Sequence, residues 1–320
     1  MAEGTTSDVM ILGQGAAAYA AAIYAARYQI KTTMFGEEFG GETATGGLIE
    51  NYPGAPAIDG FDLMLKFQEQ VEALAVPVVP ENVLELRRNG DYWEVNTGEA
   101  WHRGKTVIIA VGRVRRTLGL ANEKPLMGKG VSYCSTCDAP LYRNRRVVVV
   151  GGGDSALKGA FLISKYASEV FLSYRGSQFN RPEPIAIQRV METPNIEVLF
   201  SSRIAELKGA PELTEVVIEV QNKSARVISA DGIFIEIGAD PNSGFAKAAG
   251  SAVNESGELI VDMGMRTTLP GVFAAGDVSN ASGDLKQTIT ASAQGAIAAT
   301  SAYDFVNKMP QSPQAAAPRR

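Results

Sequence analysis

The sequence predicts an α/β protein made of two Rossmann-like, three-layer domains, with the second domain inserted into the first. A buried apolar strand leads into a glycine turn and a helix at residues 9–28, and the same arrangement recurs at residues 145–166. Strand-like sequence that carries first-domain features returns at residues 259–275. We therefore expect a first domain of residues 1–116 and 243–308, an inserted domain of residues 117–242, and a disordered tail at residues 309–320, which is rich in proline and alanine.

Composition and charge narrow the class of protein. Of the 320 residues, 45% are hydrophobic and 33 are glycine, which suits a close-packed two-domain α/β protein. The net charge is −5 without a strong block of either sign, so we expect neither nucleic acid nor a membrane surface as a partner. No stretch approaches the roughly 18 apolar residues of a membrane span. Two cysteines at redox spacing fit a reducing compartment, and we expect a cytoplasmic protein.

The first glycine turn predicts a dinucleotide site. Gly13 permits a tight turn, Gly15 lets backbone amides approach a pyrophosphate, and Ala18 keeps the helix close to the sheet. A second strand at residues 31–35 leads to Glu37, which is placed to bond a ribose hydroxyl. Glycines also end ordinary strands, so a plain packing turn is the alternative.

Between the two turns, the pattern predicts connecting structure around one helix and one buried strand. Residues 39–54 resemble a surface loop whose glycines would let the backbone lie against a flat ligand. Residues 61–74 have helical periodicity, and residues 106–112 form a buried strand. His102, the single histidine, lies just before that strand, and we expect a packed or surface residue without a catalytic role.

The second glycine turn follows the strand at residues 145–150 and contains Gly151, Gly153 and Ala156. Two such turns in one chain are far more specific than one, because chance glycine turns rarely repeat in this context. The next strand, at residues 170–174, leads to Arg175 and Arg181, which either read a ribose 2′-phosphate or belong to a solvated loop. Later strands at residues 196–200, 216–220 and 232–238 are expected to complete this sheet, with hinges at residues 113–119 and 238–242.

Cys134 and Cys137 are the only cysteines of the chain. Two intervening residues let both sulfurs converge on one turn, where they can cycle between dithiol and disulfide, and Asp138 directly behind them can handle a proton. The alternatives are half of a zinc site or two idle thiols. With one histidine and no third cysteine, a closed structural zinc site is hard to complete, so we expect no metal.

The C-terminal region returns to the first domain. Residues 271–275 form a strand that ends at Gly276 and Asp277, where an acid can bond a ribityl or ribose hydroxyl or, alternatively, cap the following helix. Alanine-rich residues 288–303 predict that helix, and Lys286 and Gln287 precede it.

From residue 9 to residue 305 the chain resembles the low-molecular-weight thioredoxin reductases. The motifs that carry the resemblance occur in the family's order and are Gly13-x-Gly15-x-x-Ala18, Glu50-Asn51-Tyr52-Pro53-Gly54, Cys134-Ser135-Thr136-Cys137-Asp138, Gly151-x-Gly153-x-x-Ala156 and Ala275-Gly276-Asp277-Val278. The resemblance implies a homodimer with FAD in the outer domain and an inserted domain that binds NADPH and carries the redox disulfide. Cys137 would face the flavin, Cys134 would attack the partner disulfide, and Asp138 would be the acid/base.

These motifs and the turns around them define the expected binding residues. The residues expected to hold FAD are Gly13, Gly15, Ala16, Ala18, Glu37, Gly41, Glu42, Thr43, Asn51, Gly112, Asp277, Lys286, Gln287 and Thr288. The residues expected to hold NAD(P)H are Gly151, Gly153, Asp154, Ser155, Ala156, Arg175 and Arg181.

The chain departs from the family at the expected NADPH site. The family signature is His-Arg-Arg-x-x-x-Arg, whereas this chain has Tyr174, Arg175, Gly176 and Asn180 at the four signature positions. Each arginine contact to a phosphate is charge-assisted, so the loss of two arginines should weaken a preference for NADPH unless Arg181 compensates. The donor is therefore left open between NADPH and NADH.

The function predicted from these residues is a thioredoxin reductase-like flavoenzyme that passes two electrons through FAD and the 134/137 disulfide to a thioredoxin-like protein. The hinges would permit a domain rotation that exposes the cysteines to that protein. One rival prediction keeps the scaffold but changes the acceptor to a peroxiredoxin system, a glutaredoxin-like protein or oxygen. Another keeps the scaffold but takes a ferredoxin as the electron donor. Two further rivals are a redox-sensing flavoprotein without turnover and a metal-binding module.

Overall fold

The computed structural model describes residues 4–55, 57–180, 182–283 and 285–308. The chain folds as two compact units: unit 1 comprises Met1–Val114 and Asp240–Arg320, and unit 2 comprises Arg115–Ala239. The predicted domain limits at residues 116 and 242 fall close to these limits at residues 114 and 239. The expected disordered tail at residues 309–320 lies outside the described residues. The two chain crossings between the units are the short strands β9 (Arg113–Arg115) and β18 (Ala239–Pro241), which pair with each other.

Unit 1 is built on a seven-stranded sheet with the order β5-β2-β1-β8-β7-β6, in which β19 also pairs with β8. The strands next to β1 and β2 run parallel, whereas β6, β7 and β8 form an antiparallel edge. The elements of unit 1 are β1 (Thr6–Leu12), α1 (Ala16–Arg27), β2 (Thr32–Phe35), α2 (Gly41–Ala44), β3 (Leu48–Ile49), β4 (Ile58–Asp59), α3 (Gly60–Ala73), β5 (Val78–Val79), β6 (Glu85–Asn89), β7 (Tyr92–Asn96), β8 (Trp101–Ile109), α7 (Gly244–Ala248), β19 (Val272–Ala274) and α8 (Thr288–Lys308).

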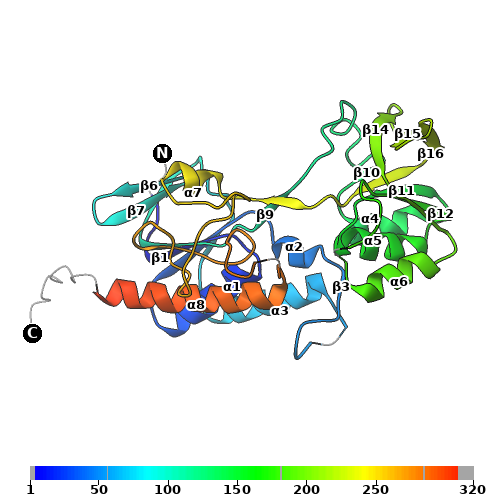
Figure 1. The fold of residues 1–320 in the computed structure, drawn as a ribbon. Coiled ribbons are helices and arrows are strands. Elements are labelled where there is room, and N and C mark those ends of the chain that lie inside the picture. Colours follow the sequence, from blue (N-terminus) through cyan, green and yellow to red (C-terminus); the bar gives the residue numbers. More distant parts are fainter. Residues whose placement is uncertain (1–3, 56, 181, 284, 309–320) are drawn as a thin grey trace, which may run out of the picture. The chain divides into compact units, whose positions relative to one another are not determined.

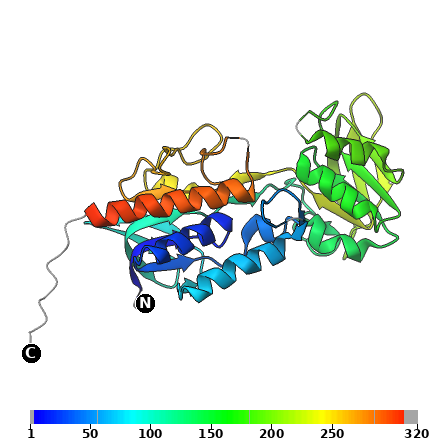
Figure 2. The same ribbon diagram turned by 90° about the horizontal axis from the view of Figure 1, so that it is seen from below.

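The sheet of unit 1 is buried on both faces, which explains why β1 is apolar at successive positions. Val9 and Ile11 pack with helices α1, α3 and α8, whereas Met10 and Leu12 point to the opposite core, beneath α7 and the β6–β7 hairpin. Side chains alternate between the faces of a strand, so one run of four apolar residues supplies two cores. Helices α1 and α8 lie side by side on the helical face, as Figures 1 and 2 show.

Unit 2 repeats this plan with a five-stranded parallel sheet in the order β10-β17-β11-β12-β13. Val147 and Val149 face helices α5 and α6, and Val148 and Val150 face a separate antiparallel sheet, β14-β15-β16. The elements of unit 2 are β10 (Val131–Ser132), α4 (Ser135–Asp138), a 3₁₀ helix (Ala139–Tyr142), β11 (Arg146–Val150), α5 (Asp154–Ser164), β12 (Glu169–Ser173), α6 (Pro184–Glu192), β13 (Ile196–Leu199), β14 (Ser202–Lys208), β15 (Glu215–Val220), β16 (Arg226–Ser229) and β17 (Gly232–Ile235). Each unit is therefore a three-layer α/β domain, as predicted.

Three sequence-based expectations are wrong in detail. The strand predicted at residues 216–220 does not complete the parallel sheet, because β15 belongs to the separate antiparallel sheet. The segment predicted as a loop at residues 39–54 contains α2 and β3. His102 lies inside β8 and not before it; it is buried, its ring packs edge-on against Phe35, and its Nδ1 accepts a hydrogen bond from the backbone amide of Thr5. Burial lowers the pKa of His102, which fits a packing role.

Candidate functional site

The two cysteines form a disulfide on one turn of helix, α4, in unit 2. Cys134 precedes α4, and its Sγ accepts a hydrogen bond from the backbone amide of Cys137 at 3.1 Å. The amide of Asp138 donates to the carbonyl oxygen of Cys134 at 3.2 Å. Cys137 is exposed and Cys134 is half-buried. The predicted pair is thus brought together by a local turn, where the sulfurs can exchange with an external disulfide.

Asp138 is oriented by a residue that the sequence patterns do not indicate. The Ser132 hydroxyl donates to Oδ2 of Asp138 at 2.7 Å, and the same hydroxyl oxygen accepts from the backbone amide of Cys134 at 3.1 Å. Ser132 is buried at the end of β10, so its rotamer is restrained by packing. One serine therefore connects the predicted acid/base to the backbone of the redox pair.

The first glycine turn connects β1 to α1 in unit 1. Gly13 has a φ of 118°, and a Cβ added there would lie 2.3 Å from the carbonyl oxygen of Ala110, so this position requires glycine. At Gly15 an added Cβ would meet no described atom within 4 Å. Gly15 precedes α1 without a side-chain cap, which leaves the first helical amides available to a phosphate. Ala16 and Ala18 are buried in α1, as close packing against the sheet requires.

Glu37 follows β2, the strand next to β1, and is exposed. Its Oε2 accepts a hydrogen bond from Nδ2 of Asn82 at 2.7 Å, and its backbone amide donates to Oδ1 of Asn82 at 3.3 Å. Asn82 is a second residue that sequence reasoning did not find. This pair holds the Glu37 carboxylate in place at the predicted ribose position.

Two predicted segments of the first site lie together although they are far apart in the sequence. The hydroxyls of Thr43, on α2, and Thr288, at the start of α8, are 3.1 Å apart. Nδ2 of Asn51 donates to Oε1 of Gln287 at 3.0 Å. Gly41 and Glu42 lie on α2 with Thr43. The structure therefore joins the predicted residues of segments 41–51 and 286–288 in one region of unit 1.

Asp277 lies just beyond β19, whose parallel neighbour β8 leads to Gly112. Burial raises the pKa of the Asp277 carboxyl, and the nearby charges of Lys286 and Arg113 oppose that rise. The alternative that Asp277 caps the following helix is wrong, because α8 begins at Thr288. Gly112 has a φ of 60°, and a Cβ added there would meet no described atom within 4 Å.

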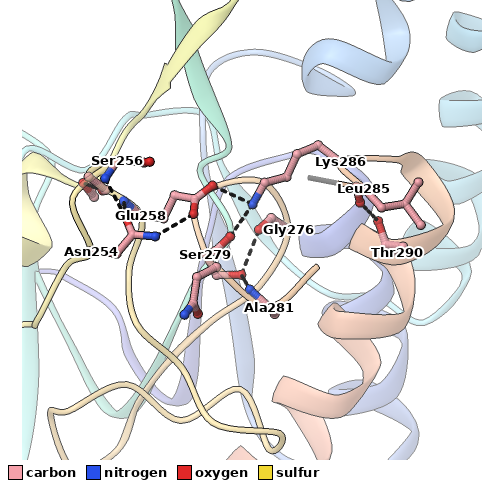
Figure 3. A network of polar contacts seen from close by, with 12 residues as sticks. Asn254, Ser256, Glu258, Gly276, Ser279, Ala281, Leu285, Lys286 and Thr290 are labelled. Atoms are coloured by element: carbon pink, nitrogen blue, oxygen red, sulfur yellow. Dashed lines mark hydrogen bonds and ion pairs between the residues drawn. The ribbon is translucent and has the colours of Figure 1, made fainter. Parts of the chain in front are cut away.

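Lys286 is held in a polar network that Figure 3 shows. Its Nζ forms an ion pair with Oε1 of Glu258 at 2.9 Å and donates to the carbonyl oxygen of Ser279. Burial alone would raise the pKa of Glu258, but hydrogen bonds from Lys286 and Asn254 hold it below its usual range. Glu258 and Arg113 are further residues of this site without a local sequence signal.

These features of unit 1 fit a flavin adenine dinucleotide. The carboxyl ends of neighbouring parallel strands β1, β8 and β19 meet at one edge of the sheet, which is where dinucleotides bind in such folds. Open space at Gly15 and Gly112 leaves room for the group, and the partly buried Asp277 supplies an acceptor for a hydroxyl.

The second glycine turn connects β11 to α5 in unit 2. A Cβ added to Gly151 would lie 2.2 Å from the carbonyl oxygen of Glu236, whereas one at Gly153 would meet no described atom within 4 Å. Asp154 starts α5, and its Oδ1 accepts from the backbone amide of Glu183 at 2.8 Å. Ser155 is exposed and Ala156 is buried. Gly153 therefore leaves the same open space after β11 that Gly15 leaves after β1.

Arg175 is exposed just beyond β12, and the ring of Tyr174 stacks on Phe179 with centroids 5.5 Å apart. Arg181 lies outside the described residues.

Among the described residues, no group of three or more histidine, cysteine, aspartate or glutamate side chains is arranged to hold a metal ion. No helix in the described part of the chain has the length and apolar character of a membrane span.

Known proteins resemble the chain over almost its full length. Residues 7–295 match the family model described as pyridine nucleotide-disulphide oxidoreductase. The thioredoxin reductase of Mycolicibacterium smegmatis is 36% identical over 93% of this chain and 96% of its own. The crystal structure of Lactococcus lactis thioredoxin reductase has a TM-score of 0.89 and 35% identity, covering 95% of this chain and all of that one. The structure of T. acidophilum thioredoxin reductase has a TM-score of 0.86 and 33% identity, covering 93% and 98%.

Proposed function

This chain belongs to the pyridine nucleotide-disulphide oxidoreductase family, and we propose that it is a thioredoxin reductase, which passes two electrons from a donor to the disulfide of a thioredoxin-like protein. The observation that carries the proposal is the Cys134–Cys137 disulfide with Asp138 beside it, in a chain with two dinucleotide turns. A metal module or an idle thiol pair does not need either turn.

FAD would bind in unit 1, where the glycine turn at Gly13 and Gly15, Glu37, Asp277 and the residues around Thr43 and Gln287 would hold it. When bound, it would supply the two-electron chemistry that side chains lack and that a return of the cysteine pair to the dithiol form requires. The protein residues would orient the group: the α1 amides would donate hydrogen bonds to the pyrophosphate, and the carboxylates of Glu37 and Asp277 would accept hydrogen bonds from hydroxyl groups.

Disulfide exchange is performed by Cys134, directly before α4, and by Cys137 and Asp138 on that helix. The thiolate of Cys134 attacks one sulfur of the partner disulfide, forms a mixed disulfide and releases one partner thiolate. Cys137 then attacks Cys134, which restores the intramolecular disulfide and releases the second partner thiolate. Asp138, held by Ser132, accepts the proton of the attacking thiol and returns it to the leaving sulfur. The partner gains two electrons and two protons, and the cysteine pair loses them.

The donor site lies at the second glycine turn in unit 2, where Gly151, Gly153, Ser155 and Arg175 would hold NADPH or NADH. Two observations support a pyridine nucleotide: the open space at Gly153 and the helix α5 that begins directly after it.

A reducing compartment suits a cysteine pair at redox spacing, and we place the enzyme in the cytoplasm on that ground.

The enzyme is a homodimer in this proposal, joined through an apolar groove of unit 1. The groove has a volume of about 490 Å³ and lies between α1, α3 and α8. Ile289, Ala293 and Ile297 recur every four residues along α8, and Ile289 and Ile297 are exposed although the opposite side of this helix is buried. Tyr24 on α1 is also exposed. A second copy would cover this face through the same residues on both chains.

Replacing Cys134 with serine tests the function. We expect C134S to keep its flavin and to lose all turnover with thioredoxin, since the attacking thiolate is gone. A panel of acceptors, comprising thioredoxin, a glutaredoxin-like protein, a peroxiredoxin and oxygen, identifies the substrate in the unaltered enzyme. Undiminished turnover by C134S would refute the proposed exchange, and turnover with oxygen alone would refute the proposed substrate.

A further inference from the structure

A carboxyl group that the proposed exchange does not use lies against the redox turn. Oγ of Ser135 donates to Oε1 of Glu236 at 2.7 Å. Ser135 is the first residue of α4, directly after Cys134, and is buried. Glu236 follows β17, and its backbone amide donates to the carbonyl oxygen of Val150 at 2.8 Å. Glu236 also has a hydrogen bond with the backbone of Ser135, so the start of the redox helix is fastened to the central sheet of unit 2 through both the hydroxyl and the backbone of this serine.

The surrounding backbone is shaped to admit this pair. A Cβ added to Gly159 on α5 would lie 2.6 Å from Oγ of Ser135 and 3.7 Å from Oε1 of Glu236. Any larger residue at position 159 would push the serine away from the glutamate. A Cβ added to Gly151 would lie 2.2 Å from the carbonyl oxygen of Glu236. Two glycines thus permit the close approach of α4, α5 and the end of β17.

The electrostatics of Glu236 differ from those of a surface carboxylate. Burial raises its pKa, while the hydrogen bond from Ser135 and the charge of Arg115 oppose the rise. The other charged groups on the elements packed around it are Asp138 on α4, Asp154 and Lys158 on α5, and Arg146 at the start of β11, where it pairs with Glu169. Asp138 is bonded to Ser132, Asp154 to the amide of Glu183, and Lys158 pairs with the Glu183 carboxylate at 3.5 Å. Burial outweighs the opposing contacts, so Glu236 is protonated more easily than a surface carboxyl, and when it ionises it places a negative charge next to the redox turn.

We propose that Glu236 is a positioning residue for the redox pair: it fixes the start of α4 through Ser135, and its charge tunes the ionisation of the Cys134 and Cys137 thiols. The proposal rests on the redox function proposed above and adds a residue to that site. A nearby negative charge disfavours a thiolate, so ionised Glu236 makes the reduced pair less acidic than an unperturbed pair. Protonation of Glu236 removes that effect.

Three variants separate the charge from the hydrogen bond. E236Q keeps an oxygen that can accept from Ser135 but has no charge, and E236A lacks both. E197Q is the matched control, because Glu197 is a carboxylate of unit 2 that lies on β13, away from α4, and pairs with Arg226 on β16. All are studied as holoenzymes with the flavin content verified.

The first measurement is the pH dependence of alkylation of the fully reduced protein by iodoacetamide, followed by mass spectrometry. We expect the thiol pKa to fall by roughly half a unit to one unit in E236Q and E236A, and to stay unchanged in E197Q. Alkylation near neutral pH should then be about three- to tenfold faster. An E236Q profile that coincides with E197Q would overturn the electrostatic role.

The second measurement is the equilibrium of the cysteine pair with glutathione. We expect E236A to shift the dithiol–disulfide equilibrium further than E236Q, because E236Q changes only the charge whereas E236A also releases the start of α4. Equal equilibria in E236A and E236Q would overturn the positioning role. Should E236A fail to fold, S135A removes the hydroxyl hydrogen bond from the other side and keeps the backbone one, so it should shift the equilibrium in the same direction as E236A but by less. Neither measurement requires turnover, so a failure to reduce thioredoxin would count against the proposed function and leave this test intact.

Discussion

Arg175 occupies in unit 2 the position that Glu37 occupies in unit 1. In unit 1, Leu12 pairs with Phe35, and Glu37 is the second residue after that pair. In unit 2, Val150 pairs with Ser173, and Arg175 is the second residue after that pair. The two glycine turns begin at the same register, immediately after Leu12 and Val150. The two equivalent positions therefore carry opposite charges. A carboxylate in unit 1 suits a ribose hydroxyl, and a guanidinium in unit 2 suits a phosphate, as in the sites proposed above.

This relationship predicts the electron donor. We expect NADPH to reduce the flavin at a lower concentration than NADH, because Arg175 can bind a 2′-phosphate. With one arginine at the described positions, the preference should be about tenfold, the magnitude of one charge-assisted hydrogen bond. Replacing Arg175 with glutamate should invert the preference. The measurement is an anaerobic titration of flavin absorbance, with R203A as control, since exposed Arg203 pairs with Glu219 on β15. An unchanged preference in R175E would contradict the assignment.

The contact between Ser132 and Asp138 predicts a graded loss of exchange. D138N removes the proton carrier, and we expect the rate of thioredoxin reduction to fall by about 100-fold or more. S132A leaves the carboxylate but removes its hydrogen bond, so the loss should be smaller, about tenfold. S132T, which keeps the hydroxyl, should recover most of the rate. Stopped-flow mixing of the prereduced enzyme with oxidised thioredoxin measures this step directly. Equal rates in S132A and the unaltered enzyme would show that Ser132 does not orient the acid.

The ion pair between Lys286 and Glu258 predicts a pH-dependent stability. Both side chains are 13% exposed, so K286M should leave a largely buried carboxylate without its partner and cost about 3 kcal/mol in the free energy of unfolding. The double variant K286M/E258Q should recover part of this loss, because it removes the unpaired charge.

The direction of the pH dependence follows from the lowered pKa of Glu258. A carboxyl whose pKa is lower in the folded state stabilises the fold above its unfolded pKa, and that contribution disappears as the pH falls through its folded pKa. The difference between K286M and the unaltered protein should therefore shrink in acid. Urea unfolding across the acid range measures it, and a difference that stays constant below the folded pKa would contradict the ion-pair explanation.

The apolar groove predicts the oligomeric state. A293E places a charge in the middle of the exposed stripe on α8, and we expect it to convert a dimer to a monomer because an interfacial carboxylate would lose its solvation. V227E is the control, since Val227 is an exposed apolar residue on β16 in unit 2. Light scattering after size-exclusion chromatography gives the mass. A dimeric A293E protein would place the interface elsewhere.

Much of the fold and the centre of the site follow from local sequence patterns. Apolar runs of four residues indicate strands buried on both faces, and glycines at fixed spacing indicate the turns at Gly13 and Gly151. The redox pair is also local, because Cys134 and Cys137 lie on one turn. These features depend on residues within a few positions of one another, so the sequence by itself determines them.

Tertiary structure decided the rest. β15 has the periodicity of a strand, but its pairing with β14 and β16 depends on distant register, which periodicity does not contain. Helix α2 has four residues and β3 has two, which is too short for any period to show. The contacts of Glu258 with Lys286 and of Glu236 with Ser135 join residues separated by 28 and 101 positions. Such partners are selected by the packing of whole elements, and only the folded chain brings them within hydrogen-bonding distance.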